Sequence, residues 1–125
     1  MTHASTYRVT RADLVAYANA SGDQNPIHQD EEVARSVGLP GVIAHGMYTM
    51  ALAARAVAEW TDGAEVVSLN AKFTAPVVVP AGDEGVEVVV TGTFADPVDG
   101  LQTIALDVLC EGRKVLGRPK AVVRA

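Results

Sequence analysis

A carboxylate and an imidazole stand close together in a short segment rich in turn-forming residues. Asp23 follows Ser21-Gly22, and His28 comes shortly after the dipeptide Asn25-Pro26. Proline restricts its own φ angle and the conformation of the residue before it, so the dipeptide predicts a tight bend. A bent loop can bring the two side chains together across a small gap, where they would hold one water molecule and move its protons. The spacing therefore predicts a general acid–base pair.

Each of the two residues also has an ordinary structural interpretation. An aspartate near a helix end is usually a cap, and a histidine among apolar residues usually fills the core. A second motif, Ala44-His45-Gly46-Met47, favours chemistry when it is taken together with the first. We place it at the start of a long helix, where the first N–H groups have no partner within the helix.

Gly46 has no side chain, so a substrate carbonyl could approach its N–H closely. An N–H group in that position would stabilise the developing negative charge of a thioester enolate. The alternative is that the helix needs a glycine there for packing, and for this residue alone the two interpretations compete. No spacing of histidines, cysteines and acidic residues predicts a metal site.

The sequence of the first half of the chain predicts helices and loops. Thr10 is a helix N-cap candidate with Asp13 three residues on, and Asp30 begins an acidic first turn. The expected elements are a short strand over 6–9, a helix ending near Ala20, a short helix over 30–36 and a long helix from 44 or 45 to 60. The long helix carries few charges, so we expect most of its sides to be buried.

The second half is rich in valine and predicts four strands, over 66–73, 86–94, 103–110 and 115–124. Arg118, Lys120, Val122 and Arg124 should share one face of the last strand, and Pro119 indicates an edge or a bulge there. Helices followed by a long antiparallel sheet are typical of the α+β class. We therefore expect one domain over 1–125, a hotdog fold in which a curved antiparallel sheet wraps around the long helix.

Composition narrows the function further. The net charge of −5 argues against nonspecific binding to nucleic acid, although Arg113, Lys114, Arg118, Lys120 and Arg124 form a basic tail that could meet phosphates or an acidic carrier protein. No apolar run is long enough to span a bilayer, and the N-terminus does not resemble a signal peptide, so we expect a cytoplasmic protein. Cys110 closes an apolar run and should be a small buried residue.

The segments Ser21-Gly22-Asp23-Gln24-Asn25-Pro26-Ile27-His28 and Ala44-His45-Gly46-Met47 resemble the hydratase motif of MaoC-like proteins. These proteins are (R)-specific enoyl-thioester hydratases and dehydratases with hotdog folds, and the likeness is greatest to the catalytic B-type subunit of (3R)-hydroxyacyl-acyl carrier protein dehydratases. Gly38-Leu39, Gly117-Arg118 and the segment from Ala71 to Pro76 extend the resemblance along nearly the whole chain. Some members carry a serine where this chain has Ala54, and many have an additional first strand. We therefore expect the sheet here either to lack one strand or to have an edge covered by a partner subunit.

The resemblance implies that Asp23 and His28 are the catalytic pair and that the Gly46 N–H binds the thioester carbonyl. Asn25, with Ser21 and His45, would support the loop, and no metal or redox cofactor would be used. Tyr48 and Trp60 are candidates for lining the acyl tunnel, with core packing as the competing role. We expect His28 to accept the proton of the water and Asp23 to act as the acid, and the sequence leaves the reverse assignment open.

The implied substrate is a trans-2-enoyl thioester of coenzyme A or acyl carrier protein, hydrated reversibly to a (3R)-3-hydroxyacyl thioester. The competing functions are a hotdog thioesterase and a noncatalytic hotdog subunit that stabilises a dehydratase partner. The retained Asp23 and His28 speak against both. A homodimer is expected first, and a heterodimer with a second hotdog subunit is the alternative.

Overall fold

Six strands form one antiparallel sheet in the computed structural model, which describes all residues 1–125. The order across the sheet is β1-β3-β4-β6-β2, with β5 paired to β4 beside this path, so β1 and β2 are the two edges. The strand bounds are β1 Thr2–Val9, β2 Val66–Phe73, β3 Val86–Phe94, β4 Leu101–Cys110, β5 Arg113–Lys114 and β6 Leu116–Arg124. The sheet remains open.

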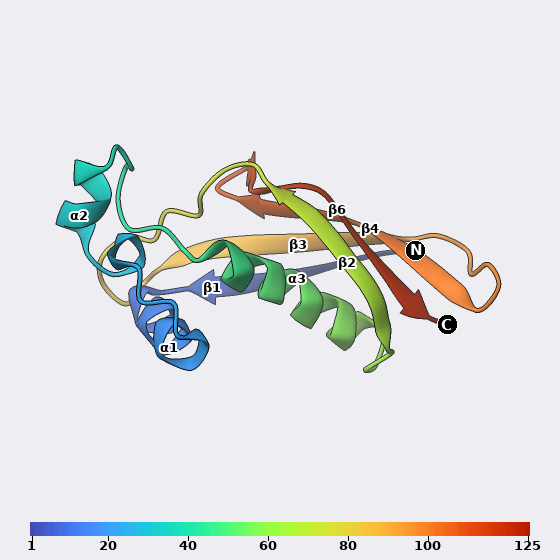
Figure 1. The fold of residues 1–125 in the computed structure, drawn as a ribbon. Helices are drawn as coiled ribbons and strands as arrows, with labels where there is room; N and C mark the ends of the chain where they lie inside the picture. Colours follow the sequence, from blue (N-terminus) through green and yellow to red (C-terminus); the bar gives the residue numbers. More distant parts are fainter.

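Three α-helices and one short 3-10 helix complete the chain: α1 Arg11–Ser21, η1 Pro26–His28, α2 Glu31–Ser36 and α3 Gly46–Trp60. Figure 1 shows α3 running along one face of the sheet, with α1 and α2 together at one end of the molecule and both chain termini at the other. The segments that carry the two motifs therefore lie at the end occupied by α1 and α2. None of the helices combines the length and apolarity that a bilayer-spanning helix needs.

The core lies between α3 and the sheet because one face of each strand is apolar. Val86, Val88 and Val90 of β3 are buried, as are Ile104, Leu106 and Val108 of β4. Small residues on α3, among them Ala53 and Ala56, let the helix approach the strands closely. The expected α+β fold, an antiparallel sheet packed on a long helix, is confirmed. Cys110 is buried at the edge of this core, as predicted.

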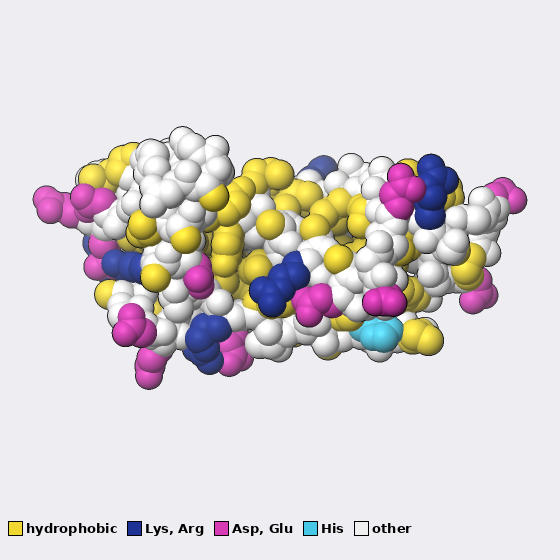
Figure 2. Space-filling view, turned by 90° about the horizontal axis from the view of Figure 1, so that it is seen from below, with side chains coloured by type: hydrophobic (Ala, Val, Ile, Leu, Met, Phe, Trp, Pro, Cys, Tyr) yellow, Lys and Arg dark blue, Asp and Glu magenta, His cyan; other side chains and the backbone are white.

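The prediction that α3 is buried on most sides is wrong. Thr49, Leu52, Ala53, Ala56 and Val57 are buried, and they follow the helical repeat on one face. Met47 on the opposite face is 59% exposed, and Ala51 and Ala58 are exposed too. The open sheet covers one side of the helix, and no second layer covers the other. Figure 2 shows hydrophobic side chains along the middle of the molecule seen from below, with charged side chains at both ends and also near the centre of this face.

Several element boundaries also differ from the expectation. The first strand begins at Thr2 because all of β1 pairs with β3, although its first residues lack an alternating pattern. The last predicted strand corresponds to β6, and a further short strand that was not predicted, β5, forms a hairpin with β4 before β6 begins. Near Pro119 the pairing of β6 with β2 is irregular, and Arg118 has a positive φ of 48°. The predicted bulge is therefore present, within the sheet and away from its edge.

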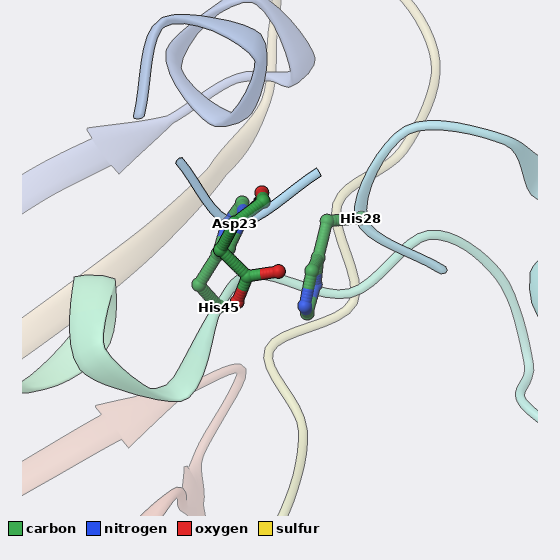
Figure 3. A group of neighbouring side chains, drawn as sticks. All are labelled: Asp23, His28 and His45. Carbon is green, nitrogen blue, oxygen red and sulfur yellow. The ribbon is translucent and has the colours of Figure 1, made fainter. Parts of the chain in front are cut away.

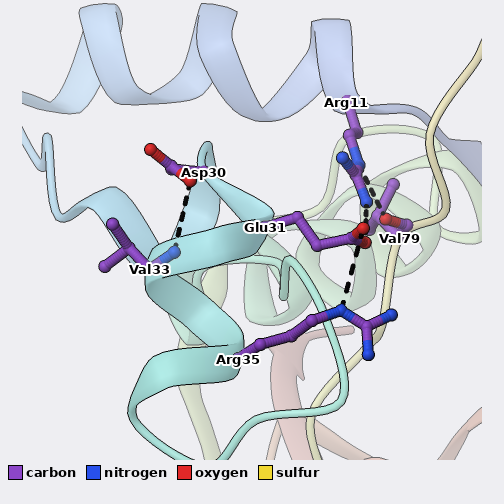
Figure 4. A network of polar contacts seen from close by, with 6 residues as sticks. All are labelled: Arg11, Asp30, Glu31, Val33, Arg35 and Val79. Carbon is purple, nitrogen blue, oxygen red and sulfur yellow. Dashed lines mark hydrogen bonds and ion pairs between the residues drawn. The ribbon is translucent and has the colours of Figure 1, made fainter.

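Ion pairs tie α1 to α2 at the end of the molecule that carries the motifs (Figure 4). Arg11 on α1 donates to Glu31 on α2 at 2.8 Å and to the carbonyl of Val79 at 2.9 Å. Glu31 also faces Arg35 one turn on, at 3.8 Å. The hydrogen bond from Arg11 is the main reason that the pKa of Glu31 is lowered. The first residue of α1 is thus tied to the first residue of α2.

Both predicted helix caps are present. The Thr10 hydroxyl accepts from the Asp13 N–H, and the Asp13 carboxylate accepts in turn from the Thr10 N–H, which is a complete capping box. Asp30 caps α2 by accepting from the Val33 N–H at 3.2 Å. These caps set the first residue of each helix, and the loop that follows α1 therefore ends at Asp30.

Candidate active site

The loop after α1 is organised by a chain of local hydrogen bonds. Helix α1 ends on Gly22, whose φ of 82° suits a residue without a side chain. The Ser21 hydroxyl accepts from the Asp23 N–H, Asp23 Oδ1 accepts from the Asn25 N–H, and Asn25 Oδ1 accepts from the Ile27 N–H, each at 3.2 Å. Asn25 is therefore the N-cap of η1. This succession fixes the direction of the Asp23 carboxylate and delivers His28 at the end of η1.

His28 is only 7% exposed, and its ring is held by the segment that precedes α3. Its Nδ1 lies 2.7 Å from the carbonyl oxygen of Ile43, and the Ile43 N–H donates to Ile27 at 3.2 Å. A carbonyl oxygen only accepts, so Nδ1 carries a proton, and in the neutral ring Nε2 keeps its lone pair. The ring thus presents a free basic nitrogen.

His45 packs directly on this ring. The two imidazole centroids are 3.8 Å apart with an angle of 23° between their planes. His45 Nε2 lies 3.1 Å from the backbone carbonyl oxygen of Asp23. Figure 3 shows the Asp23 carboxylate directed toward the His28 ring, with His45 beside it. One oxygen or nitrogen atom from each of the three residues lies within 4.8 Å of the others.

These three side chains are of types that bind metal ions, but their arrangement does not favour it. The lone pair of an imidazole nitrogen lies in the plane of its ring. Because the rings of His28 and His45 are stacked nearly parallel, their lone pairs run side by side and do not converge on one point. The geometry suits proton transfer better than ligation.

The motif residues meet at one cavity of about 660 Å³. It is lined by Ser21, Asp23, His28, His45 and Gly46 among the predicted residues. Tyr17 of α1, Phe73 at the end of β2 and Val115 form further parts of the wall. Asn25 and Tyr48 do not line it. Asn25 acts on the loop, whereas Tyr48 packs with its ring edge on Tyr17 at 5.3 Å.

The role predicted for Tyr48 as an acyl contact therefore gains no support, and the packing alternative fits its position. Burial raises the pKa of Tyr48, with a smaller contribution from the charge of Asp13. Trp60, the other tunnel candidate, stands at the opposite end of α3, where its indole N–H donates to the Ser5 hydroxyl at 3.0 Å. Tyr17 and Phe73 take the wall positions instead. Tyr17 lies in the helix predicted to end near Ala20, and Phe73 lies in the strand predicted over 66–73. No local pattern in the sequence indicated that either residue lies beside the motifs.

Gly46 is the first residue of α3, and His45 supplies no side-chain cap to that helix end. The uncapped N–H groups of the first turn therefore open toward the cavity that Gly46 lines. A Cβ atom at Gly46 would stand 2.9 Å from Cε1 of Phe73. Packing against Phe73 therefore requires a glycine at this position, as one of the two interpretations held. The same residue also leaves the N–H groups of the helix start free.

Known proteins resemble this chain in sequence and in fold. A family profile described as "MaoC like domain" matches residues 1–93. The chain is 40% identical over 79 residues to 3-hydroxyacyl-thioester dehydratase X of Mycobacterium tuberculosis, covering 62% of this chain and 27% of that protein. It is 39% identical over 72 residues to a mitochondrial 3-hydroxyacyl-[acyl-carrier-protein] dehydratase of Arabidopsis thaliana, covering 58% of this chain and 42% of the relative. A solved MaoC-like dehydratase superimposes with a TM-score of 0.92 at 37% identity, over 99% of this chain and 39% of the other.

The fold and the cavity together define a hotdog domain of the kind found in acyl-thioester hydratases and dehydratases. This chain belongs to the MaoC-like family. It spans less than half the length of each of these relatives.

Proposed function

We propose that this chain catalyses the reversible hydration of trans-2-enoyl thioesters to (3R)-3-hydroxyacyl thioesters. The observation that carries the proposal is the meeting of three groups in one cavity: the Asp23 carboxylate, the His28 imidazole and the uncapped start of α3 at Gly46. An acid–base pair and an electropositive helix end are the two elements that addition of water to a conjugated thioester needs.

The mechanism follows from the hydrogen bonds of the dyad. The thioester carbonyl accepts from the N–H of Gly46, which draws electron density from C3. Water bound between Asp23 and His28 adds to C3 and gives a proton to Nε2 of His28, because Nδ1–H is engaged by Ile43. His28 passes this proton to the Asp23 carboxylate, which delivers it to C2 on the same face, so that both groups of the pair return to their starting state. Dehydration is the reverse path.

The rate terms are of comparable size. General acid–base catalysis typically contributes about 10²- to 10⁴-fold, and one oxyanion donor about 10²- to 10³-fold. Both terms are needed to bring the reaction to a useful rate. This is why the convergence of the two motifs on one cavity matters more than either motif alone.

We further propose a coenzyme A or acyl carrier protein thioester as substrate. Arg118 and Lys120 stand exposed on the outer face of β6 and make no ion pair, whereas Arg124 is paired with Glu65 at 2.5 Å. The two unpaired cations belong to the strand that neighbours β2, and β2 ends at the cavity wall. They offer positive charge to the phosphates of either carrier.

A homodimer is the assembly that we propose. The open edge strand β2 exposes Val66 by 38%, Val67 by 46% and Phe73 by 57%. An exposed apolar edge is prone to pair with another strand, and a second copy of β2 would protect it. Light scattering on the purified chain tests this. A monomer that gains activity only with a second hotdog chain would favour the heterodimer.

The decisive experiment is incubation of the purified chain with crotonyl-coenzyme A while the absorbance of the conjugated enoyl group is followed. Wild-type protein should consume the absorbance, and Asp23→Asn should lose most of the rate while keeping its melting temperature. Asp13→Asn is a matched control, because Asp13 is a capping carboxylate on α1, the helix that precedes Asp23, and does not line the cavity.

Near-normal turnover by Asp23→Asn would refute the assignment of the dyad. Release of free thiol without hydration would indicate a thioesterase instead. Absence of any reaction with both short and long enoyl chains, on either carrier, would contradict an independent catalytic role.

A further inference from the structure

His45 is the most buried polar side chain at the site, at 2% exposed. Its Nε2 reaches the carbonyl oxygen of Asp23 at 3.1 Å, whereas its Nδ1 is the one buried side-chain polar atom of the chain that has no hydrogen-bond partner. An unpartnered polar atom in the interior carries a cost, so its presence calls for an explanation. An apolar residue of similar size would avoid that cost if filling space were the only need.

The contacts of His45 supply the explanation. A carbonyl oxygen accepts, so Nε2 of His45 carries the proton and donates to Asp23. The flat ring lies against His28 at 3.8 Å, and the edge contact with Tyr17 at 4.8 Å holds it from the other side. The side chain must therefore provide both a flat ring and an N–H at its tip. Phenylalanine lacks the N–H, and glutamine lacks the ring.

We infer that His45 is the positioning residue of the catalytic pair: it holds the backbone of Asp23 through Nε2–H and the plane of His28 through ring stacking. This inference rests on the proposed hydratase function. His45 touches one partner by hydrogen bond and the other by its face, so it sets their mutual distance without itself meeting the reacting atoms. The two partners come from one loop, and His45 comes from the start of α3. It therefore also fixes that loop relative to the helix end that would bind the carbonyl.

Two variants separate the two contacts. His45→Phe keeps a ring for stacking and loses the donor, whereas His45→Gln keeps a donor and loses the ring. Each should lower kcat by about tenfold, and His45→Ala should lower it by about 100-fold, because small displacements of reacting groups carry large penalties. KM should change less than about twofold, since His45 does not contribute to uniform substrate binding. A merely structural residue would lower stability and leave kcat of the folded fraction unchanged.

His3→Phe is the matched control. His3 also stacks on an aromatic ring, that of Trp60 at 5.8 Å, but at the opposite end of α3. It should retain kcat. If His45→Ala or His45→Phe turns over at the wild-type rate, the inference is wrong.

A spectroscopic readout is independent of activity. Nitrogen-15 NMR of the histidine rings in the wild-type protein should place the proton on Nε2 of His45 and on Nδ1 of His28. A proton on Nδ1 of His45 would remove the hydrogen bond to Asp23 and overturn the inference. This measurement needs no variant to fold. If the wild-type chain hydrates no enoyl thioester, the proposed function fails, and the ring signals still decide whether His45 holds Asp23.

Discussion

The ring of Phe73 occupies the space in which a side chain at Gly46 would stand, with Cε1 2.9 Å from the position of the absent Cβ atom. Phe73 ends the edge strand β2, whereas Gly46 begins α3. Their contact joins the wall of the cavity to the helix end that would bind the thioester carbonyl. Because the Phe73 side chain is 57% exposed, its ring is able to move aside.

Gly46→Ala should therefore fold with a melting temperature close to that of the wild type. The added methyl group would stand at the uncapped helix end, so kcat/KM for an enoyl thioester should fall at least about tenfold. Thermal denaturation and steady-state kinetics measure the two effects. A large loss of stability with unchanged kinetics would show that the glycine serves packing alone.

Gly92→Ala should behave in the opposite way. A Cβ atom there would stand 2.3 Å from Cζ3 of Trp60, whose indole is anchored to Ser5. The ring cannot easily withdraw, so overpacking should lower the free energy of unfolding by about 1–3 kcal/mol. Urea denaturation measures this, and kcat of the folded enzyme should stay unchanged because Trp60 is remote from the cavity.

Asn25→Ala should reduce turnover more than stability. The variant loses the cap that Asn25 gives to η1 through the Ile27 N–H. Removal of an N-cap typically destabilises by about 0.5–2 kcal/mol, and here the loosened segment carries His28. Asn25→Asp retains an acceptor at the same position and should recover most of the activity. Equal losses in both variants would contradict the capping role.

The ion pair of Glu31 with Arg11, which joins α2 to α1, should weaken in acid. Its pKa is lowered, chiefly by the hydrogen bond from Arg11, below the ordinary value of 4.5. A lowered folded-state pKa adds stability at neutral pH that is lost as the pH falls through it. The melting temperature of the wild type should therefore drop more steeply than that of Glu31→Gln below about pH 5. Glu32→Gln, which removes a neighbouring exposed carboxylate without an ion pair, should follow the wild type.

Cys110 should resist thiol reagents in the folded protein. It is 7% exposed, and burial is the main reason that its pKa is raised, so the reactive thiolate is scarce at pH 8. Labelling with a chromogenic disulfide should be slow in buffer and complete in urea. Rapid labelling of the native protein would show that this end of β4 opens readily.

Local chemistry explains which features the sequence could predict. The capping pairs Thr10 with Asp13 and Asp30 with Val33 are short-range, and both helices begin where those residues indicate. The course of the loop between them was also predictable, since the hydrogen bonds through Ser21, Asp23 and Asn25 each join residues two positions apart. Contacts between segments that are distant in the sequence are not indicated by any local pattern of residues. Neither Tyr17 nor Phe73 differs in sequence from an ordinary apolar position.

The error over α3 has a related cause. Apolar composition indicates that a helix avoids water, but it does not say which neighbour provides the cover. The sequence therefore predicted that Met47 and Ala51 are buried, although the sheet covers only the opposite face of α3. The prediction also missed the polar start of β1. Those residues form a strand because they pair with β3, and their own sequence has no strand pattern.

The proposed acid–base pair is contained within one turn-rich stretch, Asp23 to His28, whereas part of the cavity wall comes from the far part of the chain, including Phe73 and Val115. Exchange of the distant wall would alter the shape of the acyl compartment without rearranging the proton-transfer groups. The architecture thus separates reactivity from selectivity. Under the proposed function, substitutions in the valine-rich second half would change the preferred length of the acyl chain. The residues of the first half that transfer protons would stay unchanged.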